Sequence, residues 1–513
     1  MRSLKFVLVL AALAAAAVIA LRLIFPLPDL SGRPDSRALP ASAETRLGRL
    51  MAQGQARHPG KSGVVPLADG NEALAARLAL ADTAQATIDA QYYIWHDDTS
   101  GILLLDALQR AARRGVRVRL LLDDNGIPGL DPYVAALNAE PNFEIRLFNP
   151  STVRSPKMLG YAFDFFRMNR RMHNKSMLAD GAAAIIGGRN IGDEYFQVGE
   201  DPFYVDLDVL ATGAIVPETA ATFDAYWNSA SVFAADTILT GPGDPAGLAA
   251  RISEIRAGTA ARAFLAGAET AIARHLDTGT ALEWTDVQLV ADDPVKGQGI
   301  ARRDQLMISR LGAILGTVER RLDLVSAYFV PGTPGTAFFS DTARAGKEVN
   351  ILTNALDTTD VLLVHSGYTK YRRALLEAGV HLWELKLRGT HTGADEQIMP
   401  LGLSGASLHA KTFAVDGARI FIGSFNFDPR SATLNCEMGF LIDSPAMADR
   451  VAGLFDGPLA RAAYRPALTP EGRMVWQETL GADTRIYQEE PGATWAQQIA
   501  LVIIGLLPVE WML

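Results

Sequence analysis

One pattern of residues occurs twice in this chain of 513 residues, and it constrains the fold more than any other feature. The copies occupy residues 173–190 and 409–426, and each reads His-x-Lys, four residues, Asp, six residues, Gly, Gly or Ser, one residue, Asn. Upstream anchors repeat at similar spacing, since Tyr93 precedes Tyr328 by 235 residues. A separation that stays nearly constant indicates a duplicated domain.

Each copy predicts a β-hairpin. Asp is followed by Gly at 180–181 and at 416–417, a pair that favours tight hairpin turns. The apolar runs that follow are typical of buried strands. His and Lys two positions apart on a strand project from one face, so we expect each pair to share a catalytic face.

The paired histidines suit phosphodiester chemistry, in which one imidazole attacks phosphorus and the other protonates the leaving group. His173 and His409 are therefore candidate catalysts. Lys175 and Lys411 would bind phosphate oxygens and stabilise the charge of the transition state. Such chemistry needs no metal and no cofactor, and the sequence has no zinc-like Cys/His cluster.

The duplicated His-x-Lys-x4-Asp pattern resembles the signature of the phospholipase D superfamily, and further anchors extend the likeness over roughly residues 75–465. More narrowly, the segments 187–196, 423–431 and 364–372 look like bacterial cardiolipin synthases of the C type. The resemblance implies an α/β fold of two phospholipase D-like α/β/α sandwich domains. It also implies a pseudo-two-fold axis and one shared active site.

The resemblance also implies roles for the two halves. His173 would be the nucleophile that forms a phosphohistidine-type intermediate, and His409 would be the general acid and then the base. Implied substrates are phospholipids, namely phosphatidylglycerol, with phosphatidylethanolamine as an alternative second lipid. The alternatives are hydrolysis of phospholipids by water and, less favoured, a phosphodiesterase or nuclease. An accessory protein stays an open alternative.

The other polar motif residues have two readings each. Asp180 and Asp416 belong to the catalytic motif, but their position before Gly favours a role in closing the turn. Asn190, Ser424 and Asn426 are candidates to donate hydrogen bonds to the substrate phosphate. Turn capping is the alternative for the asparagines.

Each histidine should also contact a carboxylate that fixes its tautomer. Glu437 is the candidate for His409, because it matches an acidic residue that follows the second motif in the family. Asp206 is the candidate for His173, and Asp208 shares the same strand face.

The net charge and the N-terminal segment limit the binding partners and the location that we expect. A net charge of −9 argues against a broad nucleic-acid surface, which relies on clustered Lys and Arg. The N-terminus carries an apolar run from Phe6 to Leu21 after two basic residues, long enough to nearly span a bilayer. A cleaved signal peptide is the alternative. The expected location is a bacterial inner membrane, with the catalytic domains on the periplasmic side.

The order of elements predicts two similar halves. A strand at 86–95, a helix at 101–114 and a strand at 116–122 indicate a parallel crossover. The predicted segments are an anchor or signal segment (1–25), a tether (26–62), a first domain (63–240), a connector (241–295), a second domain (296–470) and a C-terminal tail that is interfacial or a packed helix (471–513).

Two further segments are candidates for lipid recognition. Residues 154–171 interleave apolar and aromatic side chains with basic ones, which suits a bilayer surface. A helix packed on the core is the favoured alternative. His365 and Tyr368 resemble positions that synthases share, and helix packing explains them equally well.

Overall fold

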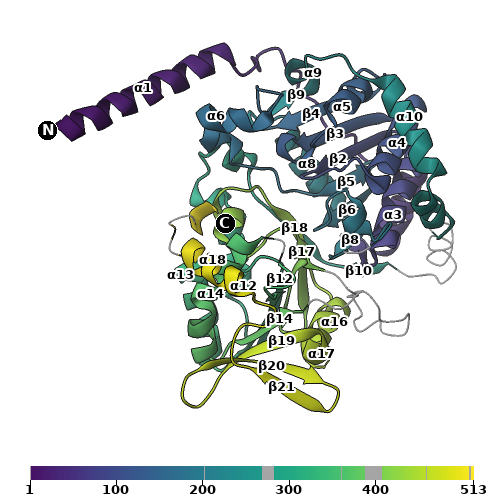
Figure 1. Ribbon diagram of the computed structural model, residues 1–513. Coiled ribbons are helices and arrows are strands. Elements are labelled where there is room, and N and C mark those ends of the chain that lie inside the picture. The colour runs from purple at the N-terminus through teal and green to yellow at the C-terminus, as the bar shows by residue number, and fades with distance from the viewer. Residues whose placement is uncertain are drawn as a thin grey trace.

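The computed structural model describes residues 2–200, 203–267, 282–359, 361–386, 407–457, 459–505, 507 and 510–512. The N-terminal apolar run forms one helix, α1 (Arg2–Ile24), which projects from the body of the molecule (Figure 1). Its segment Leu4–Ile24 has a mean hydropathy of 2.7 and is not buried against the rest of the chain. By length and composition this helix can cross a membrane.

The first half is built on a mixed sheet in the order β10-β1-β8-β6-β5-β2-β3-β4-β9. Its strands are β1 (Ser62–Leu67), β2 (Thr87–Tyr92), β3 (Arg117–Asp123), β4 (Phe143–Phe148), β5 (Ser176–Ala179), β6 (Ala183–Gly187), β8 (Asp208–Gly213), β9 (Val232–Ala234) and β10 (Glu283–Thr285). Its helices are α2 (Arg46–Arg57), α3 (Gly70–Thr83), α4 (Thr99–Arg113), α5 (Asp131–Asn138), α6 (Tyr161–Met168), α7 (Asp193–Phe196), α8 (Val216–Trp227), α9 (Ala235–Ile238) and α10 (Pro245–Ala257). Strands β2 and β3 are parallel and joined by α4, which confirms the predicted crossover.

The second half repeats the plan in the order β11-β18-β17-β16-β12-β13-β14-β19-β20-β21. Its strands are β11 (Val287–Ala291), β12 (Arg321–Ser326), β13 (Glu348–Asn354), β14 (His381–Leu385), β16 (Lys411–Val415), β17 (Arg419–Gly423), β18 (Met438–Ile442), β19 (Ala463–Leu468), β20 (Met474–Leu480) and β21 (Asp483–Tyr487). Its helices are α12 (Met307–Leu315), α13 (Gly332–Arg344), α14 (Leu362–Glu377), α15 (Pro429–Thr433), α16 (Pro445–Phe455), α17 (Leu459–Ala462) and α18 (Trp495–Gly505).

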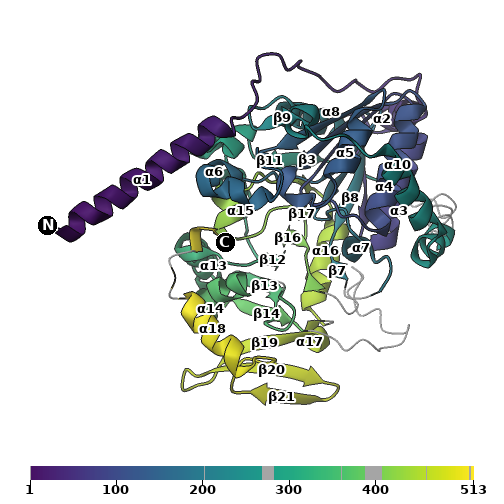
Figure 2. The same ribbon diagram turned by 45° about the horizontal axis from the view of Figure 1, so that its top comes forward.

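The two sheets share one apolar core. Side chains of α8, including Phe223 and Tyr226, and of α16, including Val451 and Leu454, belong to a single buried cluster that draws on both sheets. Helices α3 and α4 cover the outer face of the first sheet, while α12, α13 and α14 cover the outer face of the second (Figures 1 and 2). The prediction of two α/β domains packed together is thus confirmed.

The sheets also show where the halves meet along the chain. Strand β10 still pairs with β1 of the first half, whereas β11 already pairs with β18 of the second. The changeover therefore falls inside the segment predicted as a connector. At the other end the second sheet continues through β21 to Tyr487, beyond the predicted domain end at residue 470.

Candidate active site

The two motifs form the hairpins β5–β6 and β16–β17. Both residues of each Asp-Gly pair have positive φ: 52° and 60° for Asp180 and Gly181, and 57° and 64° for Asp416 and Gly417. Glycine tolerates this conformation and aspartate tolerates it better than most residues, which explains the pair at each turn. The predicted hairpins are therefore present.

The motif aspartates lie at the turns and not beside the histidines. The carboxylate of Asp180 accepts hydrogen bonds from the backbone N–H groups of Gln85, Ala86 and Thr87, at 2.8 to 3.1 Å. Asp416 accepts equivalent bonds at the start of β12. The strand after each Lys carries the Asp to the far end of the arm, where the carboxylate binds these backbone N–H groups. The contacts support the turn-closing role, and a catalytic role for the two aspartates stays a prediction.

The His-x-Lys segments differ from the expectation in one respect. Strand β5 begins at Ser176, so His173 and Lys175 lie just ahead of it in an extended segment. The backbone N–H of His173 donates to the carbonyl of Cys436 at 2.8 Å, and that of His409 donates to the carbonyl of Val205 at 2.8 Å. Each motif thus pairs its backbone with the other half of the chain.

This exchange decides which carboxylate each histidine meets. Nδ1 of His173 lies 2.8 Å from Oε2 of Glu437, and Nδ1 of His409 lies 2.5 Å from Oδ2 of Asp206. The predicted partners were the reverse. The reason is that Glu437 follows Cys436, whose backbone pairs with His173, while Asp206 follows Val205, whose backbone pairs with His409. Because each carboxylate accepts from Nδ1–H, each Nε2 is free for chemistry.

The histidines and lysines are almost fully buried together. His173 and His409 are 7% and 6% exposed, and the lysines less. Burial and the charges of Lys175, Lys411 and His409 hold the pKa of His173 well below its usual range. Lys411 and His409 belong to the second motif, and their charges lower the pKa of His173. Both motifs therefore lie in one site. Burial, followed by the charge of Lys411, likewise lowers the pKa of His409.

The lysines are held by their own motifs. The Nζ of Lys175 donates to the carbonyl of His173 at 2.6 Å, and the Nζ of Lys411 donates to the carbonyl of His409. Burial lowers the pKa of Lys175 well below its usual range, and the like charge of Lys411 adds to this effect. Two cations forced together in a buried site favour a bound anion, which suits a phosphate.

The Gly/Ser difference between the copies has a structural reason. A Cβ atom at Gly188 would come within 2.0 Å of Oδ1 of Asp206, so only glycine fits there. In the second copy the hydroxyl of Ser424 donates to Oε2 of Glu437 at 2.5 Å. Ser424 is therefore engaged with the orienting carboxylate, and its contact with substrate stays a prediction.

The two asparagines also differ. Oδ1 of Asn190 accepts from the N–H of Ile94 at 3.2 Å, and its Nδ2 donates to the hydroxyl of Tyr195 at 3.0 Å, as the turn-capping alternative expects. In the described part of the chain, Oδ1 of Asn426 is buried without a hydrogen bond. Asn426 is thus the better candidate to meet a substrate.

Three tyrosines contact the histidines, and no catalytic role was predicted for them. The ring of Tyr93 lies edge-on to His173 with centroids 5.0 Å apart, and those of Tyr195 and Tyr204 lie 5.1 and 5.3 Å from His409. Tyr93 was visible only as a repeat anchor at the end of a predicted strand. Side chains at strand ends commonly line sites in α/β folds, and this was the available signal.

Residues of opposite charge occupy equivalent positions after the two motifs. Glu194 forms an ion pair with His96 at 3.2 Å, and the charge of His409 contributes to lowering its pKa. The motif spacing places Arg430 at the equivalent position of the second copy, and the charge of Arg430 acts on Tyr93 beside His173. The histidines therefore work in different electrostatic surroundings.

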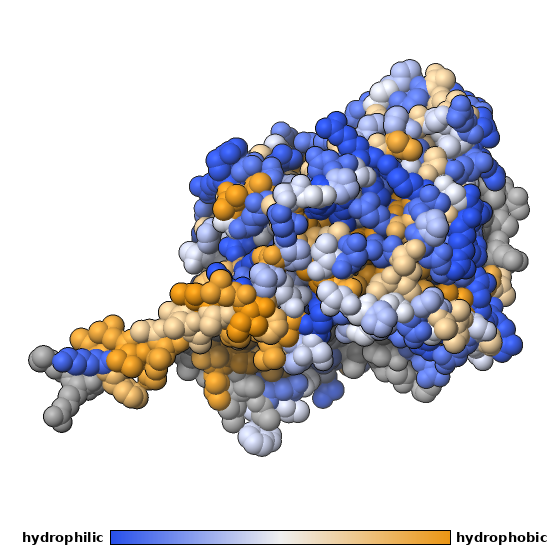
Figure 3. Space-filling model, turned by 90° about the horizontal axis from the view of Figure 1, so that it is seen from above, coloured by the Kyte–Doolittle hydropathy of each residue, from blue (hydrophilic) through white to orange (hydrophobic). Residues whose placement is uncertain are grey.

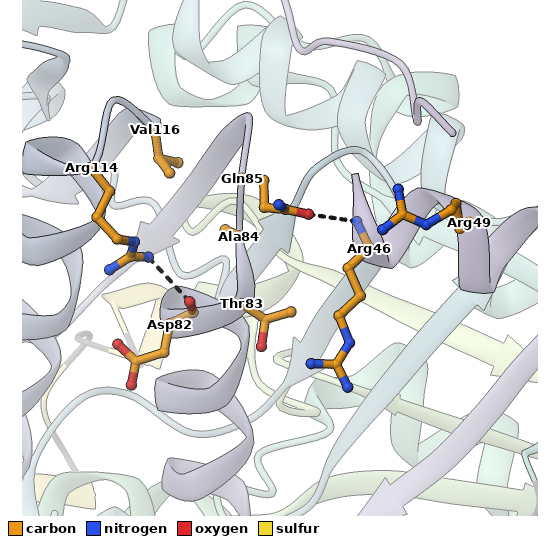
Figure 4. A pocket seen from close by; sticks show the side chains of 8 residues that line it. All are labelled: Arg46, Arg49, Asp82, Thr83, Ala84, Gln85, Arg114 and Val116. Carbon is orange, nitrogen blue, oxygen red and sulfur yellow. Dashed lines mark hydrogen bonds between the residues drawn. The ribbon is translucent and has the colours of Figure 1, made fainter. Parts of the chain in front are cut away.

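A separate pocket lies at the turn end of the first hairpin, away from the histidines (Figure 4). Its lining includes Arg46, Arg49 and Arg114, and Arg114 donates to the carbonyl of Asp82. Gln85 accepts from the backbone N–H of Arg46. None of its lining residues belongs to either motif.

The candidate lipid-recognition residues have mixed outcomes. Within 154–171, Phe163 and Met168 are buried while Phe166 is 70% exposed, so α6 is partly packed on the core. His365 and Tyr368 lie on α14. Nε2 of His365 lies 2.7 Å from Glu490, and the hydroxyl of Tyr368 donates to Glu384 at 3.0 Å. His365 thus joins α14 to the C-terminal tail and Tyr368 joins it to β14, as the helix-packing alternative expects.

Comparisons with known proteins agree with this geometry. Residues 78–227 and 313–458 match the family described as "Cardiolipin synthase, PLD-like domain". The chain belongs to this family of phosphatidyltransferases. It is 44% identical over 460 residues to cardiolipin synthase C of Escherichia coli (strain K12), across 89% of this chain and 97% of that protein.

More distant relatives extend the likeness. A cardiolipin synthase of Listeria welshimeri is 24% identical over 422 residues, across 82% of this chain and 73% of that protein. The crystal structure of a phosphatidylserine synthase of Haemophilus influenzae Rd KW20 superposes with a TM-score of 0.55 at 13% identity, across 91% of this chain and 99% of that one. At this identity the superposition shows a shared fold.

Proposed function

We propose that this chain transfers a phosphatidyl group from one phospholipid to the hydroxyl of another and thereby makes cardiolipin. The observation that carries the proposal is the crossed pair of His–carboxylate contacts, His173 with Glu437 and His409 with Asp206, around two buried lysines. This arrangement supplies two oriented imidazoles and a cationic site for one phosphate. The 44% identity to a cardiolipin synthase supports the choice of product.

In the first step, Nε2 of His173 attacks phosphorus and the bond to the leaving headgroup oxygen breaks. His409 is protonated on both ring nitrogens at this stage and gives its Nε2 proton to that oxygen, which departs as an alcohol. The phosphatidyl group is then held on His173. Lys175 and Lys411 offset the negative charge on the phosphate oxygens as the transition state forms.

In the second step, the acceptor hydroxyl gives its proton to His409 and attacks phosphorus, and the bond to His173 breaks. With phosphatidylglycerol as acceptor, the free glycerol hydroxyl takes up the phosphatidyl group and the product is cardiolipin. Water entering at the same position would give phosphatidic acid, which is the alternative function. The headgroup donor is phosphatidylglycerol or a second phospholipid such as phosphatidylethanolamine.

We also propose that α1 holds the enzyme in a bacterial inner membrane with its catalytic domains on the periplasmic side. The apolar span Leu4–Ile24 supports an anchor. Labelling of single cysteines placed in the exposed segment 469–473 by an impermeant reagent on intact spheroplasts tests the side. Labelling only after lysis would contradict the periplasmic assignment.

The deciding experiment uses the purified full chain in vesicles of defined phosphatidylglycerol, with and without phosphatidylethanolamine whose acyl chains are deuterated. Mass spectrometry should find cardiolipin, and the label in it identifies the donor. His173→Ala serves as the inactive control. Phosphatidic acid as the sole product, at a rate independent of any lipid alcohol, would contradict the synthase proposal and support the hydrolase.

A further inference from the structure

Exposed apolar side chains lie near the C-terminal end of α1, where this helix joins the body of the molecule. Four of them lie on the 3-10 turn Lys157–Gly160, on α6 and on the C-terminal turn Glu510–Met512, and are 48% to 70% exposed. We call these residues the anchor-side patch: Met158, Leu159, Phe166 and Trp511. Large exposed apolar patches on a folded protein mark surfaces that contact a partner or a membrane.

The patch unites two distant parts of the chain. The rings of Phe165 on α6 and Trp511 near the C-terminus lie 6.5 Å apart, edge to face. Arg430 donates to the carbonyl of Asn169 at 2.9 Å and to that of Met512 at 3.4 Å. One surface therefore includes both segments, and the same arginine belongs to the second motif region.

The patch is continuous with the membrane helix. Nε of Arg22, near the end of α1, donates to the carbonyl of Phe163 at 2.8 Å, and the rings of Phe25 and Phe163 stack with centroids 6.0 Å apart. Apolar side chains continue from α1 onto the body of the molecule (Figure 3). Since α1 can span a bilayer, its contacts with α6 hold that helix at the level of the headgroups.

The patch also borders the active site. Helix α6 ends at Met168, and the chain then runs through Asn169 to His173. Arg430 bridges this stretch to the C-terminal segment, and its charge acts on Tyr93, which contacts His173. These contacts therefore link the patch to the half-site of His173.

From this continuity we infer that the anchor-side patch docks on the lipid bilayer in which α1 is inserted and seats the His173 side of the active site at the membrane surface. The occupant is the acyl and headgroup boundary of that bilayer, into which Phe166, Met158 and Trp511 insert. Arg22 reaches the polar interface at the same depth. The inference rests on the proposed function only where it concerns access of lipid to the site.

Depth-dependent fluorescence quenching tests the docking without any activity. Phe166→Cys and Trp511→Cys are labelled with a fluorophore in the full chain, whose native Cys436 is fully buried. The protein is reconstituted in phosphatidylglycerol/phosphatidylethanolamine vesicles that carry a nitroxide high on the acyl chain. Ile486→Cys is the matched control, because Ile486 is 54% exposed on β21, at the end of the molecule remote from α1 (Figure 1).

The nitroxide should quench both patch labels at least about twofold, because interfacial side chains sit roughly 5–10 Å below the headgroups. The label at position 486 should stay unquenched. Equal quenching at 166 and 486 overturns the inference. Emission at 166 that responds to protein concentration and not to the nitroxide also overturns it, since a second copy of the chain would then cover the patch.

An activity comparison tests the access role. The double variant Met158→Asp with Phe166→Asp should lose roughly tenfold or more of its turnover on vesicles, because two large apolar side chains no longer favour the bilayer. Turnover on dispersed short-chain phosphatidylglycerol should change less than about twofold, since that substrate needs no docking. Ile486→Asp is the control. Equal loss on both substrates would contradict the access role and leave the quenching result to decide docking.

Discussion

Oε2 of Glu437 lies 2.8 Å from Nδ1 of His173, although the two residues are 264 positions apart and belong to opposite halves of the molecule. Asp206 and His409 repeat the relationship in the other direction. Neither half therefore holds a complete oriented histidine, and the site exists only when the halves are packed together.

The two histidines should fail in different ways. His173→Ala removes the nucleophile and should abolish turnover, whereas His409→Ala should slow transfer between phospholipids by about 10²–10⁴-fold through loss of the general acid. A phosphatidyl ester of p-nitrophenol needs no protonation of its leaving group. With this substrate His409→Ala should still release a burst of one p-nitrophenolate per site. A burst from His173→Ala would reverse the assignment.

Activity should rise with pH up to neutrality. Burial raises the pKa of Glu437 to about 7, so at lower pH the carboxyl is protonated and no longer accepts strongly from His173. With the p-nitrophenyl ester, whose leaving group needs no protonated His409, the rate of intermediate formation should fall about tenfold per pH unit below pH 7. The lowered pKa of His173 keeps that imidazole deprotonated, so His173 does not supply this limb. Glu437→Gln should be less active and should lack the limb. An unchanged profile in that variant would exclude Glu437 as its source.

The motif aspartates should matter for stability and not for chemistry. Asp180→Ala leaves the backbone N–H groups of Gln85, Ala86 and Thr87 without their acceptor. The free energy of unfolding should fall by about 1–3 kcal/mol. The kcat of the folded fraction should stay within a few fold of the wild type, as measured by denaturant unfolding and active-site titration. Asp180→Asn keeps one acceptor oxygen and should be milder. A large loss of kcat at unchanged stability would support a catalytic role.

The resistance of the C-terminal segment to local opening should depend on the carboxylate of Glu490. Glu490 contacts His365 and Arg372 at 2.7 Å each, and Arg372 is buried on α14. Arg372 also forms an ion pair with Glu384 at 3.0 Å, so Glu490→Gln removes one of two carboxylates that offset its charge. Loss of one partner from a buried charged network is destabilising. Limited proteolysis should then cleave the chain after Tyr487 at least about tenfold faster, because local opening becomes easier. Glu489→Gln, at an exposed neighbouring position, should leave the rate unchanged, and equal rates in the two variants would contradict the prediction.

The hairpins and the parallel crossover were predictable because their signals are local. Asp-Gly pairs at 180 and 416 specify turns with positive φ, and apolar periodicity specifies the strands beside them. The role of Asp180 at the turn followed from the same chemistry. By contrast, the sequence offered no means to see that Gly188 leaves room for the carboxylate of Asp206. That fact depends on the packing of two separate strands.

The sequence by itself determined that the chain has two copies of one domain, each with a His/Lys pair ahead of a tight hairpin. It also determined the family, since both motifs are complete. Only the tertiary structure decided that Glu437 contacts His173 and that Asp206 contacts His409. The reason is that the backbone of each motif hydrogen-bonds to the residue that precedes the carboxylate in the other half. Such a crossed contact leaves no periodic or local trace in the sequence. It arises from how two folded domains share one core.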